Sequence, residues 1–156
     1  LKAAFFGERK VDGEVRAILL TRALDGWDDL DSLLQRWSDL SSAQHSAILQ
    51  ACGQLARRLH GARQVHGCFY PKHIFLQATG DGYLAQLIDL EKTRPLLFGL
   101  RDRAKDLEPL LRRAPEWSEA QLRELLAAYL DQSQDSSLID SWLARLTARR
   151  THKETR

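Results

Sequence analysis

A loop with two histidines and a cysteine runs directly into a predicted β-hairpin, and this succession constrains the fold most. The loop covers residues 66–73 and reads HGCFYPKH. Residues 74–78 and 83–90 are rich in apolar side chains and flank the turn sequence Thr-Gly-Asp-Gly, so they predict two antiparallel strands. The second strand ends at Asp89, sixteen residues after His73. Since a hairpin returns the chain to its starting edge, we expect Asp89 to lie beside the loop.

Apolar periodicity predicts one further hairpin and a helical remainder. Residues 3–9 and 15–23 are apolar-rich and flank Asp12-Gly13, a dipeptide that accepts the positive φ angles of a tight turn. Apolar side chains at intervals of three and four residues predict a short helix near 30–37 and a longer one, for which Ser41-Ser42 offers the N-cap and which Gly61 ends. Three more helices are expected: over 102–113, from Ser118 in a capping box with Gln121, and over 136–149. The order predicts an α+β chain in one compact unit.

Composition excludes several classes of protein. The 156 residues are 44% hydrophobic and 28% charged, as in an ordinary globular domain, and a net charge of +2 predicts no nucleic-acid partner. Two cysteines favour a reducing compartment. The sequence has no long apolar run and no charged-then-apolar signal pattern. We therefore expect that the chain neither spans a membrane nor carries an export signal. Because it contains no Met, we expect that it starts within a longer protein or was processed at its start.

The basic surplus is local. It gathers in the last dozen residues, which we interpret first as a solvated tail and alternatively as a contact with a polyanion or a membrane surface. The residues are Arg145, Arg149, Arg150, Lys153 and Arg156.

The loop and the strand after it resemble a known family. The spacing H-x-C-x-x-x-x-H over residues 66–73, followed by Leu-Ile-Asp-Leu-Glu-Lys at 87–92, is similar to the lipopolysaccharide kinase family, and the HGC opening to its InaA-like branch. The resemblance implies an α+β, protein-kinase-like fold, mainly the helical C-terminal lobe with a β-hairpin remnant of the N-terminal lobe. The implied division is a hairpin and hinge over residues 1–24, a helical lobe over 25–150 and a basic tail over 151–156.

The resemblance also implies roles for individual residues, with ATP and Mg²⁺ as cofactors. Asp89 would coordinate the Mg²⁺ that bridges the ATP phosphates, and His73 would be a second metal or phosphate contact. Cys68 stands at the position of the catalytic base, and His66 would be a packed residue that supports the loop. Asp106 would hydrogen-bond the loop backbone from the helical lobe.

Nucleotide contacts are implied on both sides of the loop. Residues 20–23 would form the hinge that holds adenine through main-chain groups, and two apolar side chains would close the pocket floor. Lys72 is a candidate phosphate contact, although a solvated loop charge is the simpler interpretation. The hinge residues are Leu20, Thr21, Arg22 and Ala23, and the floor residues are Leu76 and Ile88.

Two departures from the family pattern limit the expected activity. A Cys68 thiol replaces the usual Asp and is a poorer acceptor for a sugar hydroxyl proton. The sequence also lacks a G-x-G-x-x-G loop, a strand lysine and its glutamate partner. We therefore expect ATP-dependent phosphotransfer to a lipopolysaccharide core sugar that is weak or incomplete in this chain. The alternative is an inactive pseudokinase that acts as a binding or stress-response module.

Partners and location follow from the same resemblance. We expect a nucleotide, a lipopolysaccharide core at the inner-membrane face, and either the missing N-terminal lobe or a dimer partner against the unpaired edge of the first hairpin. The expected location is cytoplasmic and peripheral to the inner membrane.

Two rival chemistries use the same loop residues. One is a zinc site built from His60, His66, Cys68 and His73, whose spacing matches no common closed site. The other is a Cys68–His nucleophile pair, for which no oxyanion motif or orienting residue is visible.

Overall fold

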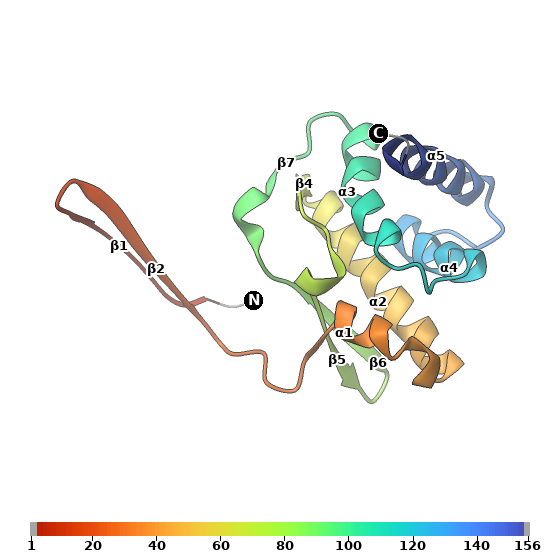
Figure 1. The fold of residues 1–156 in the computed structure, drawn as a ribbon, viewed down its shortest axis with the longest axis horizontal. Helices are drawn as coiled ribbons and strands as arrows, with labels where there is room; N and C mark the ends of the chain where they lie inside the picture. The colour runs from red at the N-terminus through yellow and green to blue at the C-terminus, as the bar shows by residue number, and fades with distance from the viewer. Residues whose placement is uncertain (1–2, 155–156) are drawn as a thin grey trace.

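The computed structural model describes residues 3–154 and the side chains up to residue 149. A helical body carries short strands along one side, and a long hairpin projects away from it (Figure 1). The helices are α1 (Leu30–Gln35), α2 (Ser42–Gly61), α3 (Leu100–Arg112), α4 (Glu119–Leu130) and α5 (Ser137–Glu154). Short 3-10 turns are η1 (Trp37–Asp39), η2 (Pro71–His73) and η3 (Leu90–Lys92). The strands are β1 (Ala3–Val11), β2 (Glu14–Thr21), β3 (Asp28–Asp29), β4 (Gln64–Val65), β5 (Ile74–Thr79), β6 (Gly82–Leu87) and β7 (Arg94–Pro95). The predicted α+β class is confirmed.

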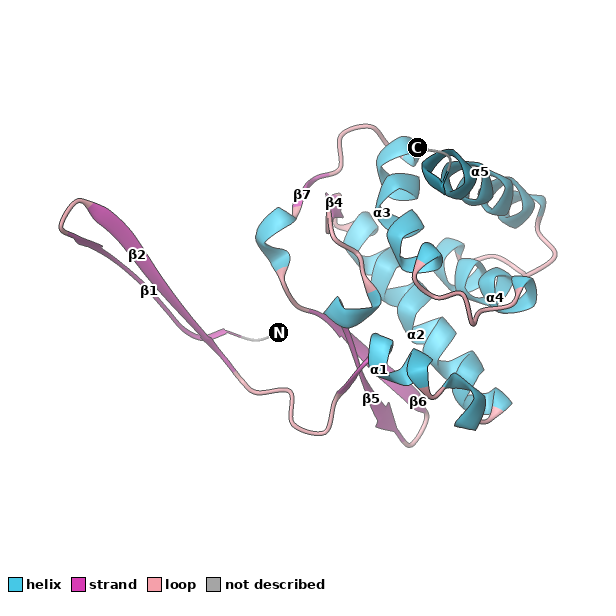
Figure 2. Ribbon diagram, viewed as in Figure 1, coloured by secondary structure: helices cyan, strands magenta, loops and turns pink. Residues whose placement is uncertain are grey.

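The long helix α2 runs through the middle of the helical body (Figure 2). Its predicted N-cap is confirmed as a full capping box, in which Ser41 and Gln44 satisfy each other's backbone N–H groups. α2 packs against α4 and β6. At Gly53 the two helices come so close that an added Cβ would lie 2.4 Å from the carbonyl oxygen of Leu125. This position therefore requires glycine for packing rather than for backbone conformation.

One hydrophobic core joins the helices to the β5–β6 hairpin. Its fully buried members come from every helix: α4 packs on the apolar face of α2, and α5 packs against α3 and α4. The largest of them include Leu30, Leu33, Ile48, Leu49, Phe69, Ile74, Leu76, Leu107, Leu110, Leu125, Leu126 and Ile139.

Two small sheets flank the loop of residues 66–73. The predicted second hairpin is confirmed as β5 paired with β6. β3 pairs with the free edge of β5 through Asp28 and Asp29. β4 and β7, two residues each, pair through Gln64 and Pro95 and tie the start of the loop to the segment after Asp89. Both ends of the loop are thereby anchored by strand pairing.

The first hairpin stands apart from the core. β1 and β2 pair with each other and with no other described strand. Six large apolar side chains on them are more than half exposed: Phe5, Phe6, Val15, Ile18, Leu19 and Leu20. The hairpin exists as predicted, and both of its faces are uncovered.

The C-terminal helix continues further than its apolar pattern predicted. α5 extends to Glu154, so residues 151–154 of the predicted basic tail are helical, while Arg156 lies outside the described residues. The division of the chain at residues 24 and 150 stays a prediction. None of the described helices has the length and apolar character needed to cross a bilayer.

Candidate functional site

Asp89 occupies an unusual backbone position next to the loop. The Ile88 N–H donates to the carbonyl oxygen of His73 at 3.1 Å, which joins the end of β6 to the end of the loop. Asp89 then adopts a left-handed conformation, with φ 59° and ψ 56°. A non-glycine residue in this region is uncommon and costs free energy, and such positions gather at functional sites. The conformation turns the Asp89 carboxylate back towards the loop, with its side chain 41% exposed.

The imidazole of His73 is the closest group to that carboxylate. Nε2 of His73 lies 3.2 Å from Oδ2 of Asp89, and Nδ1 lies 2.9 Å from the carbonyl oxygen of Cys68. Because a carbonyl can only accept, Nδ1 must carry a proton. In the neutral ring Nε2 is then a bare acceptor that faces a carboxylate, which is unfavourable unless the ring is protonated or a cation lies beside both groups. Histidines that bind metals commonly donate their second ring N–H to a backbone carbonyl in this way.

The donor chemistry decides which cation fits. Among residues 3–154, no group of three or more His, Cys, Asp or Glu side chains could hold a metal, so Asp89 and His73 would supply only part of a coordination shell. Mg²⁺ is usually held by one or two carboxylates together with water and substrate phosphates, and Asp89 fits that role. An imidazole nitrogen suits softer divalent ions. Asp89 is therefore the residue that would hold Mg²⁺, with His73 beside it as a weaker ligand or a phosphate contact.

Cys68 is buried in the loop, and its backbone holds the neighbouring rings. Its N–H donates to Nδ1 of His66, and its carbonyl oxygen accepts from His73. The thiol is 8% exposed at the position where the family resemblance places a base. The other cysteine, Cys52, lies fully buried in α2, where burial raises the pKa of its thiol to about 12. Cys52 is thus chemically inert.

His66 has a structural position. It is 0% exposed, and Nε2 donates to the carbonyl oxygen of Ile88 at 2.9 Å while Nδ1 accepts the Cys68 N–H. Both ring nitrogens are satisfied by backbone groups in a single neutral tautomer. His66 therefore fixes the residue that precedes Asp89 against the loop.

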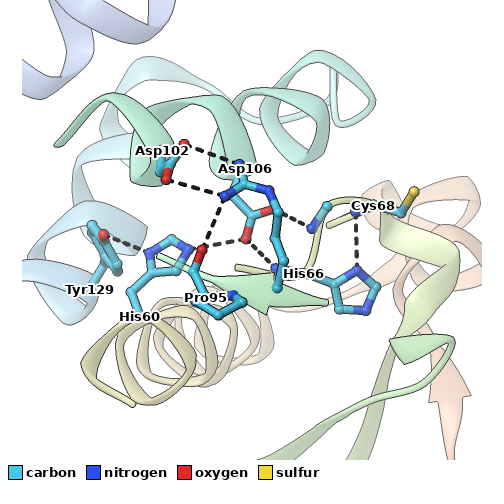
Figure 3. A network of polar contacts seen from close by, with 9 residues as sticks. His60, His66, Cys68, Pro95, Asp102, Asp106 and Tyr129 are labelled. Carbon is cyan, nitrogen blue, oxygen red and sulfur yellow. Dashed lines mark hydrogen bonds and ion pairs between the residues drawn. The ribbon is translucent and has the colours of Figure 1, made fainter. Parts of the chain in front are cut away.

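Asp106 holds the loop backbone from α3, which is the contact that the resemblance implied (Figure 3). Its two carboxylate oxygens accept the N–H groups of His66 and Gly67, each at 2.8 Å. His60 contacts Asp106 through Nε2 at 3.1 Å and the Tyr129 hydroxyl through Nδ1 at 2.8 Å. Burial raises the pKa of Tyr129 to about 12, so it stays a neutral phenol. Asp106 thus links α2 and α4 to the loop through His60.

Gly67 is a requirement of this arrangement that the sequence did not reveal. Its φ is +80°, and an added Cβ would lie 2.7 Å from the carbonyl oxygen of Lys92. The backbone of the loop at Gly67 therefore lies in close contact with the backbone at Lys92, in the segment that follows Asp89. The position of a glycine between His66 and Cys68 could have indicated this requirement from the sequence.

A second carboxylate clamp, at Asp102, was also missed. Its oxygens lie 3.1 and 3.3 Å from the two terminal nitrogens of Arg94 and accept the N–H groups of Leu97 and Phe98 at 3.0 Å each. The hydrogen bond from Arg94, followed by that from the Phe98 N–H, holds the pKa of this carboxyl well below its usual range. An acid in the first turn of a predicted helix was the available signal, but nothing local indicated its partners.

The predicted nucleotide contacts lie in three different environments. The hinge residues Leu20, Thr21, Arg22 and Ala23 are exposed at the end of β2 and just after it. Of the two floor residues, Leu76 is 1% exposed in the core, whereas Ile88 is partly exposed. Lys72 is exposed in η2. Their roles towards a nucleotide stay predictions.

The two rival chemistries do not fit the geometry. His60 is occupied by Asp106 and Tyr129, and no zinc-type cluster forms among the described residues. A nucleophilic Cys68 would need a histidine nitrogen free to accept its proton. Both nitrogens of His66 are engaged with backbone groups, and those of His73 face the Cys68 carbonyl oxygen and the Asp89 carboxylate rather than the thiol.

Comparisons with known proteins agree with the loop motif. The model of the lipopolysaccharide kinase (Kdo/WaaP) family matches residues 1–129. Protein InaA of Escherichia coli (strain K12) is 31% identical over 115 residues, which cover 67% of this chain and 53% of that protein. The chain thus spans about half the length of that curated relative. A solved structure of WaaP in complex with acyl carrier protein shares 22% identity and a TM-score of 0.78 over 97% of this chain and 68% of that one.

The match to a solved structure shows the fold of this chain, and the match to the family model shows the family to which the chain is related. The predicted kinase-like architecture and the predicted kinship to InaA are both confirmed. This chain belongs to the lipopolysaccharide kinase (Kdo/WaaP) family.

Proposed function

We propose that this protein binds ATP with a divalent cation at Asp89 and His73, and that its full-length form transfers phosphate to a sugar hydroxyl of the lipopolysaccharide core. The observation that carries the proposal is the approach of Nε2 of His73 to within 3.2 Å of the Asp89 carboxylate. Family membership supports a kinase-like function. The acceptor, the location at the cytoplasmic face of the inner membrane and the use of Mg²⁺ are parts of the proposal.

The proposed reaction forms one bond and breaks another. The sugar hydroxyl oxygen attacks the γ-phosphorus of ATP, the bond to the ADP oxygen breaks, and the hydroxyl proton passes to an acceptor. When bound, Mg²⁺ neutralises charge on the phosphates. Asp89, with His73 beside it, would hold that cation, while Cys68 offers no carboxylate to take the proton. Positioned bases contribute about 10²- to 10⁴-fold, so we expect slow transfer.

The nucleotide would lie between the hinge and the loop. Main-chain groups of Leu20, Thr21, Arg22 and Ala23 would bind adenine, with Ile88 and Leu76 beneath it, and Lys72 would contact a phosphate from η2. The exposure of residues 20–23 leaves their main chain accessible to a ligand.

The test is nucleotide binding by the full-length protein with and without Mg²⁺ or Mn²⁺, measured by calorimetry. Asp89→Ala should abolish the part of ATP affinity that depends on the cation. Asp81→Ala is the matched control, because Asp81 is an exposed acid in the turn between β5 and β6. If Asp89→Ala binds ATP as tightly as Asp81→Ala does at every cation concentration, the metal role of Asp89 is wrong.

The substitution at Cys68 favours a second candidate, a pseudokinase that binds nucleotide without transferring phosphate and acts as a binding or stress-response module. Cys68→Asp in the full-length protein separates the two. Increased γ-phosphate transfer to core oligosaccharide or to water would show that the site is still assembled for chemistry. Unchanged ATP binding with no transfer in either form would favour the module.

The first hairpin implies a partner. Because both faces of β1 and β2 are uncovered, we propose that preceding residues of a longer protein, or a second copy, cover them. The 156-residue chain should then self-associate in solution. A monomer at micromolar concentration, measured by sedimentation, would argue against this proposal.

A further inference from the structure

The loop between β7 and α3 displays large apolar side chains on a fixed backbone. It arches over one end of the molecule, clear of the helices (Figure 2). Leu97, Phe98 and Leu100 are 68%, 64% and 43% exposed. Leu96 anchors the loop instead, since it is 6% exposed and its N–H donates to the carbonyl oxygen of Arg63 at 2.8 Å. Three neighbouring apolar side chains at the tip of an anchored loop need a partner more than a scattered exposed leucine does.

The backbone N–H groups at the end of this loop are satisfied within the protein and do not need water. The N–H groups of Leu97 and Phe98 both donate to Asp102, whose charge is neutralised by the paired guanidinium of Arg94. An apolar medium penalises every unsatisfied backbone donor. Asp102 removes that penalty at the two most exposed apolar residues. If the loop were always in contact with water, the hydrogen bonds from Leu97 and Phe98 to Asp102 would add little stability, because water could satisfy the same N–H groups.

The exposed charge on the first turns of α3 is basic. Residues 92–105 contain five basic side chains and one acid, and of these Arg94 pairs with Asp102 while Lys92 lies 3.9 Å from Glu91. Arg101 and Lys105 lie one turn apart on the exposed side of α3, and the Arg101 guanidinium lies 6.0 Å from the centre of the Phe98 ring. A cation beside an apolar tip can stay at the level of lipid headgroups while the tip enters the acyl region. The surface is complementary to an anionic one.

We propose that residues 97–101 dock this protein on an anionic membrane surface, with Leu97, Phe98 and Leu100 inserted and Arg101 and Lys105 at the headgroups. The proposal rests on the proposed function only in that a lipid-linked acceptor would bring the protein to a bilayer. A second copy is disfavoured as occupant, because a two-fold contact would bring identical basic rims together.

The experiment is co-sedimentation of the full-length protein with phosphatidylcholine vesicles, with and without phosphatidylglycerol and without nucleotide. Wild type should bind the anionic vesicles, and salt should weaken the binding. Leu97→Ser combined with Phe98→Ser should weaken binding by about tenfold or more. Arg101→Gln combined with Lys105→Gln should weaken it by about fivefold per charge and reduce the salt dependence.

Controls separate this proposal from folding and from catalysis. Leu84→Ser combined with Leu138→Ser removes two leucines of 54% and 44% exposure elsewhere and should leave vesicle binding unchanged. ATP affinity should be equal in all variants, so failure of the nucleotide proposal would leave the vesicle result standing.

Three outcomes would overturn the docking surface. They are absence of wild-type binding to anionic vesicles, equal loss in the loop variant and the leucine control, and a loop variant that dissolves a dimer without affecting vesicle binding.

Discussion

The carboxylate of Asp106 offers the sharpest test of how this fold positions its loop. Asp106→Ala would leave the buried N–H group of His66 and the part-buried N–H group of Gly67 without their acceptor, since both donate to Asp106 at 2.8 Å. An unsatisfied buried donor costs about 1–3 kcal/mol, and water can reach the exposed Gly67, so the free energy of unfolding should fall by about 1–3 kcal/mol. Total stability of such a domain is about 5–15 kcal/mol, so this loss is large. His60 would lose its carboxylate partner as well.

Urea unfolding monitored by circular dichroism measures the effect, with an unchanged m-value as the sign of two-state behaviour. Asp106→Asn keeps one acceptor oxygen and should lose less than Asp106→Ala. Asp28→Ala is the surface control, because its ion pair with Arg36 is about half exposed on both sides and should contribute less than about 1 kcal/mol. A loss in Asp106→Ala no larger than that of Asp28→Ala would refute the reasoning, as would fully protected amides at His66 and Gly67 in hydrogen exchange.

Two further predictions concern packing and pH. Gly53→Ala should lower the free energy of unfolding by about 1–3 kcal/mol, because its Cβ would meet the Leu125 carbonyl oxygen, whereas Gly61→Ala in the same helix has open space and should raise it by about 0.5–1 kcal/mol. Thermal melts of the two variants shifting in the same direction would contradict this. Because Arg94 depresses the pKa of Asp102 in the folded protein, the unfolded chain takes up a proton there first as the pH falls. The contribution of Asp102 is therefore present above an unfolded pKa of about 4 and is lost as the pH falls through the folded value. Asp102→Asn should be less stable than wild type at neutral pH and lose less stability on acidification, and parallel pH profiles from urea unfolding would contradict the assignment.

Local patterns predicted the parts of the fold that local physics determines. The capping box predicted at Ser118 is confirmed, and the N-cap offered by Ser41-Ser42 falls at Ser41, because both satisfy backbone groups within four residues. The β5–β6 hairpin follows from its turn residues, and its geometry brings Asp89 back to His73. These features depend on contacts between neighbours in the chain.

The missing parts depend on partners far apart in the chain. β4 and β7 have two residues each, too few for a strand pattern, and they pair across some thirty residues. His60 meets Tyr129 and Asp106 at separations of 69 and 46 residues, which no periodicity indicates. The left-handed conformation of Asp89 was not predicted either, although Asp adopts it more readily than most non-glycine residues.

Two buried acids of α3 hold the backbone of the candidate site without using the side chain of Cys68. Asp102 and Asp106 are four residues apart, so they lie on one face of the helix. Asp106 holds the N–H groups of the loop before Cys68, and Asp102 holds those of the loop that carries Phe98. Neither clamp uses the side chain of Cys68. A substitution at Cys68 should therefore leave Asp89 in place against His73, since the contact of Cys68 with His73 is made by its backbone carbonyl oxygen.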